Sequence, residues 1–147
     1  MTEATTQSYQ GGCLCGAVRY EVDGPPVVVA HCHCINCQKA SGSSHSTGAM
    51  FRDEQIRLTG NVAEYKYKAD SGHEVTRVFC PTCSSSILGH NTGMMGFSTI
   101  TLGTLDDSSE FEPQVTIFAR NRKAWGIVDE SLPTFDAQPD WQPEDGI

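Results

Sequence analysis

The stretch His31-Cys32-His33-Cys34-Ile35-Asn36-Cys37 places three thiols and two imidazoles within one short segment. Cysteines with the spacing C-x-C-x-x-C can turn three sulfurs toward one point when the backbone wraps around a common ligand. Zn²⁺, which thiolates bind at about 2.3 Å, is the usual ligand. Three protein ligands leave the fourth tetrahedral position open, and an open position is typical of a catalytic zinc site. The stretch therefore predicts a reactive metal site.

The seven cysteines of the chain fall into three groups, with none outside them. We call the central group, Cys32, Cys34 and Cys37, the tripod. The two outer pairs are far apart in the sequence, and they most simply meet in a closed four-cysteine site of the structural type. This site would join the first strand to a later hairpin. The pairs are Cys13 with Cys15, and Cys80 with Cys83.

Spacing alone leaves two alternatives open. A histidine could close the tripod site, although His31 and His33 flank a ligand, and residues beside a ligand generally point away from the metal. Alternatively, the Cys80–Cys83 pair could share a metal with two of the tripod thiols, leaving spare cysteines. The histidines available for the first alternative are His31, His33, His45, His73 and His90.

Length and charge limit the classes of function. A chain of 147 residues is expected to form one domain with a true core. Its net charge of −8 arises largely from six acids in the last nineteen residues, so the body of the protein is near neutral. No stripe of Lys and Arg is present to neutralise phosphates, which disfavours nucleic-acid binding. The small cluster Arg120, Arg122 and Lys123 is either a solvated strand end or a clamp for a substrate carboxylate.

The cellular location is predicted to be cytoplasmic, with no membrane association. The first ten residues are polar, and no apolar run approaches the ~18 residues of a membrane span. An odd number of cysteines in tight groups favours reduced, metal-bound thiolates over disulfides.

The hydrophobic pattern predicts an all-β fold. No segment keeps a period of 3.6 residues over a dozen positions, whereas short apolar or alternating runs recur with turns every eight to twelve residues. Residues 34–41 are expected to form a turn or short helix, and glycines at 11–16 are expected to bend the backbone around the first cysteine pair. Strands are expected at 17–22, 27–30, 46–51, 55–59, 64–68, 74–79, 97–105 and 115–119, with a further one at 125–128.

The chain is divided into three parts by these patterns. Residues 1–9 are expected to be a flexible N-terminus, and residues 10–135 to form the folded domain. Residues 136–147 read as an acidic tail interrupted by proline, and the segment from Asp129 onward is expected to pack at Phe135 and Trp141.

Three motifs together resemble the glutathione-dependent formaldehyde-activating enzyme family, also called the CENP-V/GFA domain family. They are GGCLCGAVRYEV, HCHCINCQKASGS and VTRVFCPTC, and the match extends over roughly residues 10–135. The resemblance implies a β-rich fold with a zinc ribbon, shared with methionine-R-sulfoxide reductases, and two Zn²⁺ per chain. It implies a structural zinc on Cys13, Cys15, Cys80 and Cys83 and a catalytic zinc on Cys32, Cys34 and Cys37.

The family resemblance also implies a reaction. The family joins glutathione to formaldehyde, giving S-hydroxymethylglutathione, and is classed among the carbon-sulfur lyases. A thiol with a pKa near 8.5 is mostly protonated at neutral pH, and zinc would deprotonate it and hold it beside an aldehyde.

Two other classes of function are weighed against this one. A non-catalytic zinc module that binds protein partners is the main alternative. A redox enzyme of the sulfoxide-reductase kind needs a free nucleophilic cysteine, and every cysteine here belongs to a cluster.

Overall fold

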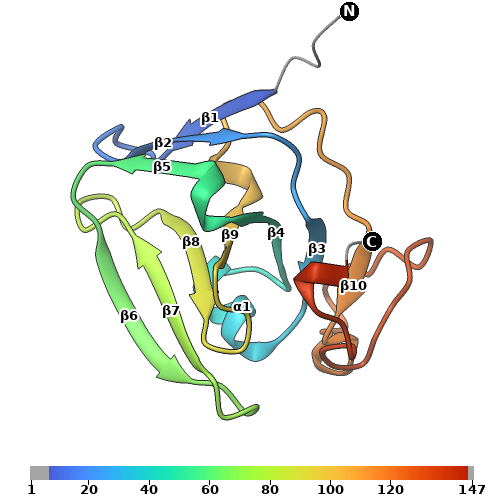
Figure 1. Cartoon of the computed structure of the whole chain (residues 1–147). Helices are drawn as coiled ribbons and strands as arrows, with labels where there is room; N and C mark the ends of the chain where they lie inside the picture. The colour runs from blue at the N-terminus through green and yellow to red at the C-terminus, as the bar shows by residue number, and fades with distance from the viewer. Residues whose placement is uncertain (1–6, 146–147) are drawn as a thin grey trace, which may run out of the picture.

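The computed structural model describes residues 7–145, and these form two β-sheets and one α-helix, α1 (Ile35–Ser41). Figure 1 shows the smaller sheet across the top of the molecule, with the larger sheet and α1 below it. The smaller sheet has the order β1 (Ser8–Gly12), β2 (Arg19–Asp23) and β5 (Ile56–Thr59). The larger has the order β10 (Val115–Ile117), β3 (Val28–Cys32), β4 (Ser46–Arg52), β9 (Phe97–Thr101), β8 (Ser86–Asn91), β7 (Glu74–Phe79) and β6 (Ala63–Lys68).

β3 is an interior strand of the larger sheet, and it ends at the first cysteine of the tripod. It pairs in parallel with β10 and antiparallel with β4, so it has a neighbour on each edge. Val28 and Val29 are both buried, although they point to opposite faces of the strand. The unbroken apolar run at 27–30 therefore reflects a strand covered on both faces, as the sequence pattern predicts.

The hydrophobic core contains residues from both sheets. Val18 and Val22 are fully buried from the segment that includes β2, and they belong to the same cluster as Phe51, Ile87 and Ile100 of the larger sheet. Because side chains on a strand alternate between faces, the predicted alternation at 17–22 is confirmed by this burial. The two sheets thus share one apolar core.

The mainly β character of the fold is confirmed, but several local predictions differ from the structure. β1 and β8 have no counterpart among the expected strands. Residues 8 and 9 belong to β1, whereas they were expected in the flexible N-terminus, of which residues 1–6 lie outside the described residues. Glycine and polar residues interrupt the apolar pattern of both segments, so their sequences alone do not indicate strands. Hydrogen bonding to neighbouring strands stabilises their extended conformation.

Three further strand predictions are wrong in extent or kind. The segment 115–119 is a strand only to Ile117, because Phe118 adopts the left-handed conformation at φ +57° and Ala119–Asn121 forms a 3₁₀ turn. The segment 97–105 is a strand only to Thr101, after which Leu102–Thr104 forms a 3₁₀ turn. The segment 125–128 is not a strand but part of a loop, where the N–H of Gly126 donates to the carbonyl of Lys123 at 3.0 Å. A Cβ at Gly126 would overlap the Cβ of Ser44, so glycine lets the loop pack closely against Ser44.

The chain after residue 129 is held by main-chain hydrogen bonds. The N–H of Phe135 donates to the carbonyl of Thr116 at 2.9 Å, and the N–H of Ala119 donates to the carbonyl of Phe135 at 3.0 Å. Phe135 itself remains 41% exposed. The expected anchoring at Phe135 is therefore achieved by the backbone. Pro143–Asp145 forms a 3₁₀ turn, and residues 146 and 147 lie outside the described part of the chain. Among residues 7–145, no helix has the length and apolar character to cross a membrane.

Candidate metal centres

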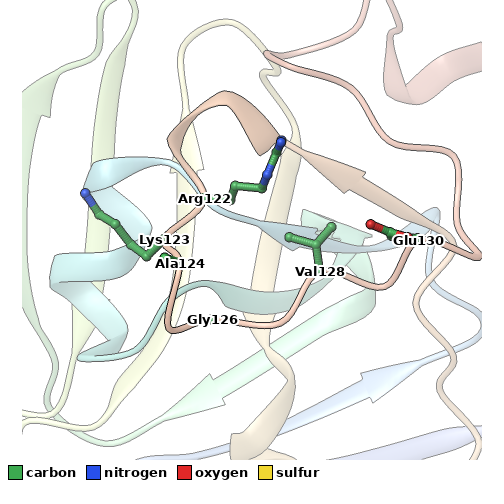
Figure 2. A pocket seen from close by; sticks show the side chains of 6 residues that line it. All are labelled: Arg122, Lys123, Ala124, Gly126, Val128 and Glu130. Carbon is green, nitrogen blue, oxygen red and sulfur yellow. The ribbon is translucent and has the colours of Figure 1, made fainter.

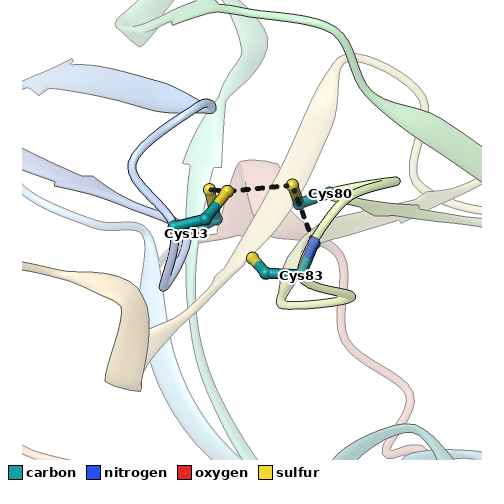
Figure 3. A group of neighbouring side chains, drawn as sticks. Cys13, Cys80 and Cys83 are labelled. Carbon is teal, nitrogen blue, oxygen red and sulfur yellow. Dashed lines mark hydrogen bonds between the residues drawn. The ribbon is translucent and has the colours of Figure 1, made fainter.

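The two outer cysteine pairs meet where the two sheets approach each other. Cys13 and Cys15 lie in the turn between β1 and β2, and Cys80 and Cys83 lie in the turn between β7 and β8. Figure 3 shows Cys13 facing Cys80 and Cys83 across this gap. The four sulfurs lie within 4.8 Å of one another. We call this group the four-cysteine cluster.

The spacing of these sulfurs fits a tetrahedral zinc ion. With Zn–S bonds of about 2.3 Å, two sulfurs on a tetrahedron are about 3.8 Å apart. The Sγ atoms of Cys13 and Cys15 are 3.6 Å apart, and those of Cys15 and Cys80 are 3.8 Å apart. Four thiolate donors at these distances form the donor set of a closed structural zinc site.

Local turns aim hydrogen-bond donors at these sulfurs. The N–H of Val18 donates to the Sγ of Cys13 at 3.2 Å, and the N–H groups of Thr82 and Cys83 approach the Sγ of Cys80 at 3.4 and 3.5 Å. The first turn contains Gly16 at φ +84°, the left-handed region that glycine adopts without strain. This is the backbone bend that the glycines at 11–16 predict. Such donors stabilise the thiolate form that a metal requires.

The tripod is assembled from a strand end and a helix start. Cys32 ends β3, Cys34 is the N-cap of α1, and Cys37 lies in its first turn. The Sγ of Cys34 accepts the N–H of Cys37 at 3.2 Å, so it fills the capping role that a serine or aspartate oxygen usually has. The three sulfurs lie within 4.8 Å of one another. The short helix expected at 34–41 is thus present and shapes the tripod.

The tripod thiols differ in their pKa values. Hydrogen bonds from Cys32 and Cys34, aided by the Ser46 hydroxyl and the charge of Arg77, lower the pKa of Cys37 to about 2 despite its burial. The same contacts with the neighbouring sulfurs raise the pKa of Cys32. The thiolate of Cys37 is therefore stabilised by its neighbours. A thiol set of this kind releases protons when it binds a metal.

The histidines form a separate ring cluster. The ring of His45 lies 5.0 Å from those of both His31 and His33, and Nδ1 of His31 is 2.7 Å from the Thr47 hydroxyl. Burial, followed by the charge of His45, lowers the pKa of both His31 and His33, which favours their neutral forms. Across residues 7–145, no histidine nitrogen or carboxylate oxygen joins the tripod's group of ligand atoms.

Sequence reasoning missed Arg77, which reaches the tripod from another strand. Its Nη2 lies 3.5 Å from the Sγ of Cys37, and its Nε donates to the Tyr67 hydroxyl at 3.2 Å. Arg77 is forty residues from Cys37 in the sequence. The alternation in 74–79 indicates only that it faces away from the buried Thr76 and Val78. No sequence signal links it to the metal site.

The three cationic residues Arg120, Arg122 and Lys123 do not form one group. Arg120 places its guanidinium carbon 5.7 Å from the centre of the Phe118 ring. Arg122 and Lys123 instead line a cavity of about 420 Å³, and Figure 2 shows their side chains pointing in different directions. Gln38, next to Cys37, donates to the carbonyl of Asn121 at 2.9 Å. The loop that carries this cavity is therefore tied to α1.

Comparisons with known proteins identify the family of the chain and a shared fold. The family model for the glutathione-dependent formaldehyde-activating enzyme matches residues 8–121. A crystal structure of a Rhodobacter sphaeroides protein is similar, with a TM-score of 0.54 and 20% identity over 66% of this chain and 87% of that one, which shows a shared fold. No curated protein matches the sequence. Because the family model covers most of the chain, the protein belongs to the glutathione-dependent formaldehyde-activating enzyme family.

Proposed function

We propose that this protein is a zinc-dependent carbon-sulfur lyase that joins a small thiol to an aldehyde, with glutathione and formaldehyde as substrates. The observation that carries the proposal is the tripod, whose three sulfurs lie together without a fourth ligand atom among the described residues. A donor set of this kind leaves a position for a substrate. The family supplies the identity of the substrates.

Each cysteine group has a proposed role. The four-cysteine cluster would hold a structural zinc that joins the β1–β2 and β7–β8 turns as a zinc ribbon, and the tripod would hold a catalytic zinc. Zinc, when bound, lowers the pKa of a thiol that reaches it. In the overall reaction the thiol gives up its proton, its sulfur forms a bond to the carbonyl carbon, and the carbonyl oxygen takes up a proton. The product is S-hydroxymethylglutathione.

Arg122 and Lys123 are proposed to hold carboxylates of the thiol substrate. Both line the cavity in the loop that Gln38 ties to α1, and Gly126 of the same loop packs against Ser44. Guanidinium and ammonium groups are suited to bind carboxylates. Arg120 instead places its guanidinium over the Phe118 ring, so we do not include it among the proposed carboxylate-binding residues.

A non-catalytic zinc module remains the alternative function. It predicts that the tripod metal is closed to added ligands, whereas the enzyme predicts that it accepts a thiol. A cytoplasmic location and a fold shared with methionine-R-sulfoxide reductases stay predictions from the sequence.

We expect about two zinc ions per chain, and we expect a mild chelator to remove the tripod ion first. A chelator attacks an ion with an open position more readily than one enclosed by four sulfurs, and the four-cysteine cluster also ties two sheets together. Native mass spectrometry before and after chelation measures the number of ions. Either a single zinc per chain or simultaneous loss of both ions would contradict the division of cysteines into four and three.

The proposed function is tested by thiol uptake. After mild chelation, Co²⁺ is loaded into the emptied tripod while zinc remains in the four-cysteine cluster. Added glutathione is then expected to change the sulfur-to-cobalt charge-transfer band, because a fourth thiolate joins the three of the tripod. The control is the same protein with S-methylglutathione, which keeps the carboxylates but lacks the thiol.

Two results would overturn this proposal. If no small thiol changes the band and a histidine is found as the fourth ligand, the site is closed and the module replaces the enzyme. If S-methylglutathione changes the band as much as glutathione does, the ligand is not bound through its sulfur.

A further inference from the structure

The hairpin of β6 and β7 presents a polar, aromatic face toward α1 and the tripod. Arg77 is paired with Tyr65 across the two strands, and Tyr67 with Val75, so these four side chains share one face. The neighbours of Arg77 on its own strand, Thr76 and Val78, are buried on the other face. This register aims Arg77 at the tripod from a part of the chain that supplies none of the tripod cysteines.

Arg77 is held in place at two points. One nitrogen, Nη2, contacts the Sγ of Cys37 at 3.5 Å, and Nε donates to the Tyr67 hydroxyl at 3.2 Å. Its guanidinium carbon lies 6.0 Å from the centre of the Tyr67 ring. Because a guanidinium stays protonated throughout the pH range in which proteins fold, a positive charge lies beside the Sγ of Cys37.

That charge matters because the tripod gathers negative charge. Three thiolates on Zn²⁺ leave one net negative charge, and a bound substrate thiolate adds a second. In a partly buried site this accumulation opposes binding of an anion unless a cation lies close by. Arg77 is the cation that contacts a tripod sulfur among residues 7–145. A hydrogen bond to a coordinating sulfur also lowers its electron donation to the metal.

We infer that Arg77, oriented by Tyr67, is a positioning residue that supplies the counter-charge for binding of an anionic thiolate at the tripod. The inference rests on the proposed function, because it assumes an open tripod metal. It assigns a role in substrate affinity to a residue outside the metal ligands and outside the Arg122–Lys123 cavity.

The test uses the full chain with zinc in the four-cysteine cluster and Co²⁺ in the tripod. Glutathione affinity is measured from the charge-transfer band for the wild type, Arg77→Met, Arg77→Lys and Tyr67→Phe. Loss of a charge-assisted hydrogen bond predicts that Arg77→Met weakens binding roughly ten- to a hundredfold. Arg77→Lys keeps the charge and should recover part of the affinity. Tyr67→Phe keeps the ring, so its effect should be smaller than that of Arg77→Met.

A spectroscopic signature separates this role from simple packing. Removing the hydrogen bond to Cys37 raises the energy of the sulfur electrons, so the cobalt charge-transfer band of Arg77→Met without added thiol should move to lower energy. Arg52→Met is the matched control, because Arg52 also lies over an aromatic ring, 5.1 Å from the centre of Phe97. This control should change neither the band nor the affinity.

The outcomes also distinguish this inference from the proposed function. If the wild type takes up no thiol, the proposed function fails and the inference fails with it. If the wild type takes up thiol and Arg77→Met binds it equally well with an unchanged band, the role of Arg77 is wrong while the enzyme proposal stands. Equal weakening in Arg77→Lys and Arg77→Met would show that charge is not the property that matters.

Discussion

The Cys80→Ser variant is expected to be unfolded at 25 °C, whereas the wild-type chain is folded. Cys80 is fully buried and belongs both to the four-cysteine cluster and to the hydrophobic core. A structural zinc contributes about 10–16 kcal/mol in small zinc folds, while the net stability of a domain is only about 5–15 kcal/mol. Losing one ligand from such a site therefore removes an amount comparable to the whole stability of the protein.

Because the four-cysteine cluster joins the two sheets, loss of its zinc should destabilise the whole domain. The cluster links the β1–β2 turn of the smaller sheet to the β7–β8 turn of the larger sheet. Without the metal link, the shared core depends on apolar contacts and on a few hydrogen bonds, such as the 3.0 Å bond from the Leu14 N–H to the Ser85 hydroxyl.

Circular dichroism and a thermal melt measure the effect. Ser85→Ala is the matched control, because it alters a hydroxyl beside the same cluster without removing a metal ligand, and its melt should remain cooperative. A cooperative melt of Cys80→Ser within a few degrees of the wild type would show that the four-cysteine cluster is not a structural zinc site.

The Cys34→Ser variant is expected to remain folded but to lose the proposed lyase activity. Serine is a favourable N-cap, so α1 keeps a side-chain acceptor for the N–H of Cys37. The tripod lies on the end of one strand and the first turn of one helix, so no link between the sheets is lost. A loss of about 1–2 kcal/mol, or roughly 3–8 °C in Tm, is expected.

The loss of activity should be much larger than the loss of stability. Holding a thiol beside the aldehyde can contribute up to ~7–11 kcal/mol to lowering the barrier, and each ~1.4 kcal/mol corresponds to a tenfold change in rate. A tripod without one of its thiolates is expected to lose at least roughly a thousandfold in kcat/KM. Activity with glutathione and formaldehyde is measured above the uncatalysed reaction, and a thermal melt is recorded on the same sample.

Two results would contradict this expectation in different ways. An unfolded Cys34→Ser chain would make the tripod a structural site. A folded variant with unchanged activity and unchanged cobalt spectrum would separate the reaction from the tripod. Ser43→Ala, an exposed position just beyond α1, is the matched control and should alter neither property.

The sequence by itself determined the local features of both cysteine groups. The C-x-C-x-x-C spacing confines three sulfurs to one loop, and the structure brings them within 4.8 Å of one another. The alternation at 17–22 and the apolar run at 27–30 were sufficient to predict a half-buried strand and a covered one. These features follow from contacts between residues close in sequence, which spacing and periodicity encode directly.

Only the tertiary structure decided which distant groups meet. The pairing of Cys13 and Cys15 with Cys80 and Cys83 depends on the order of strands in two sheets, and spacing alone left other pairings open. Arg77 reaches Cys37 because the register of β6 and β7 puts Arg77 and Tyr67 on one face of the hairpin, where Tyr67 holds the guanidinium beside the tripod. The segment 125–128 likewise has a strand-like composition, but within residues 7–145 it pairs with no strand. Such contacts arise from packing between segments far apart in the chain, and the period of a single segment carries no information about its partner.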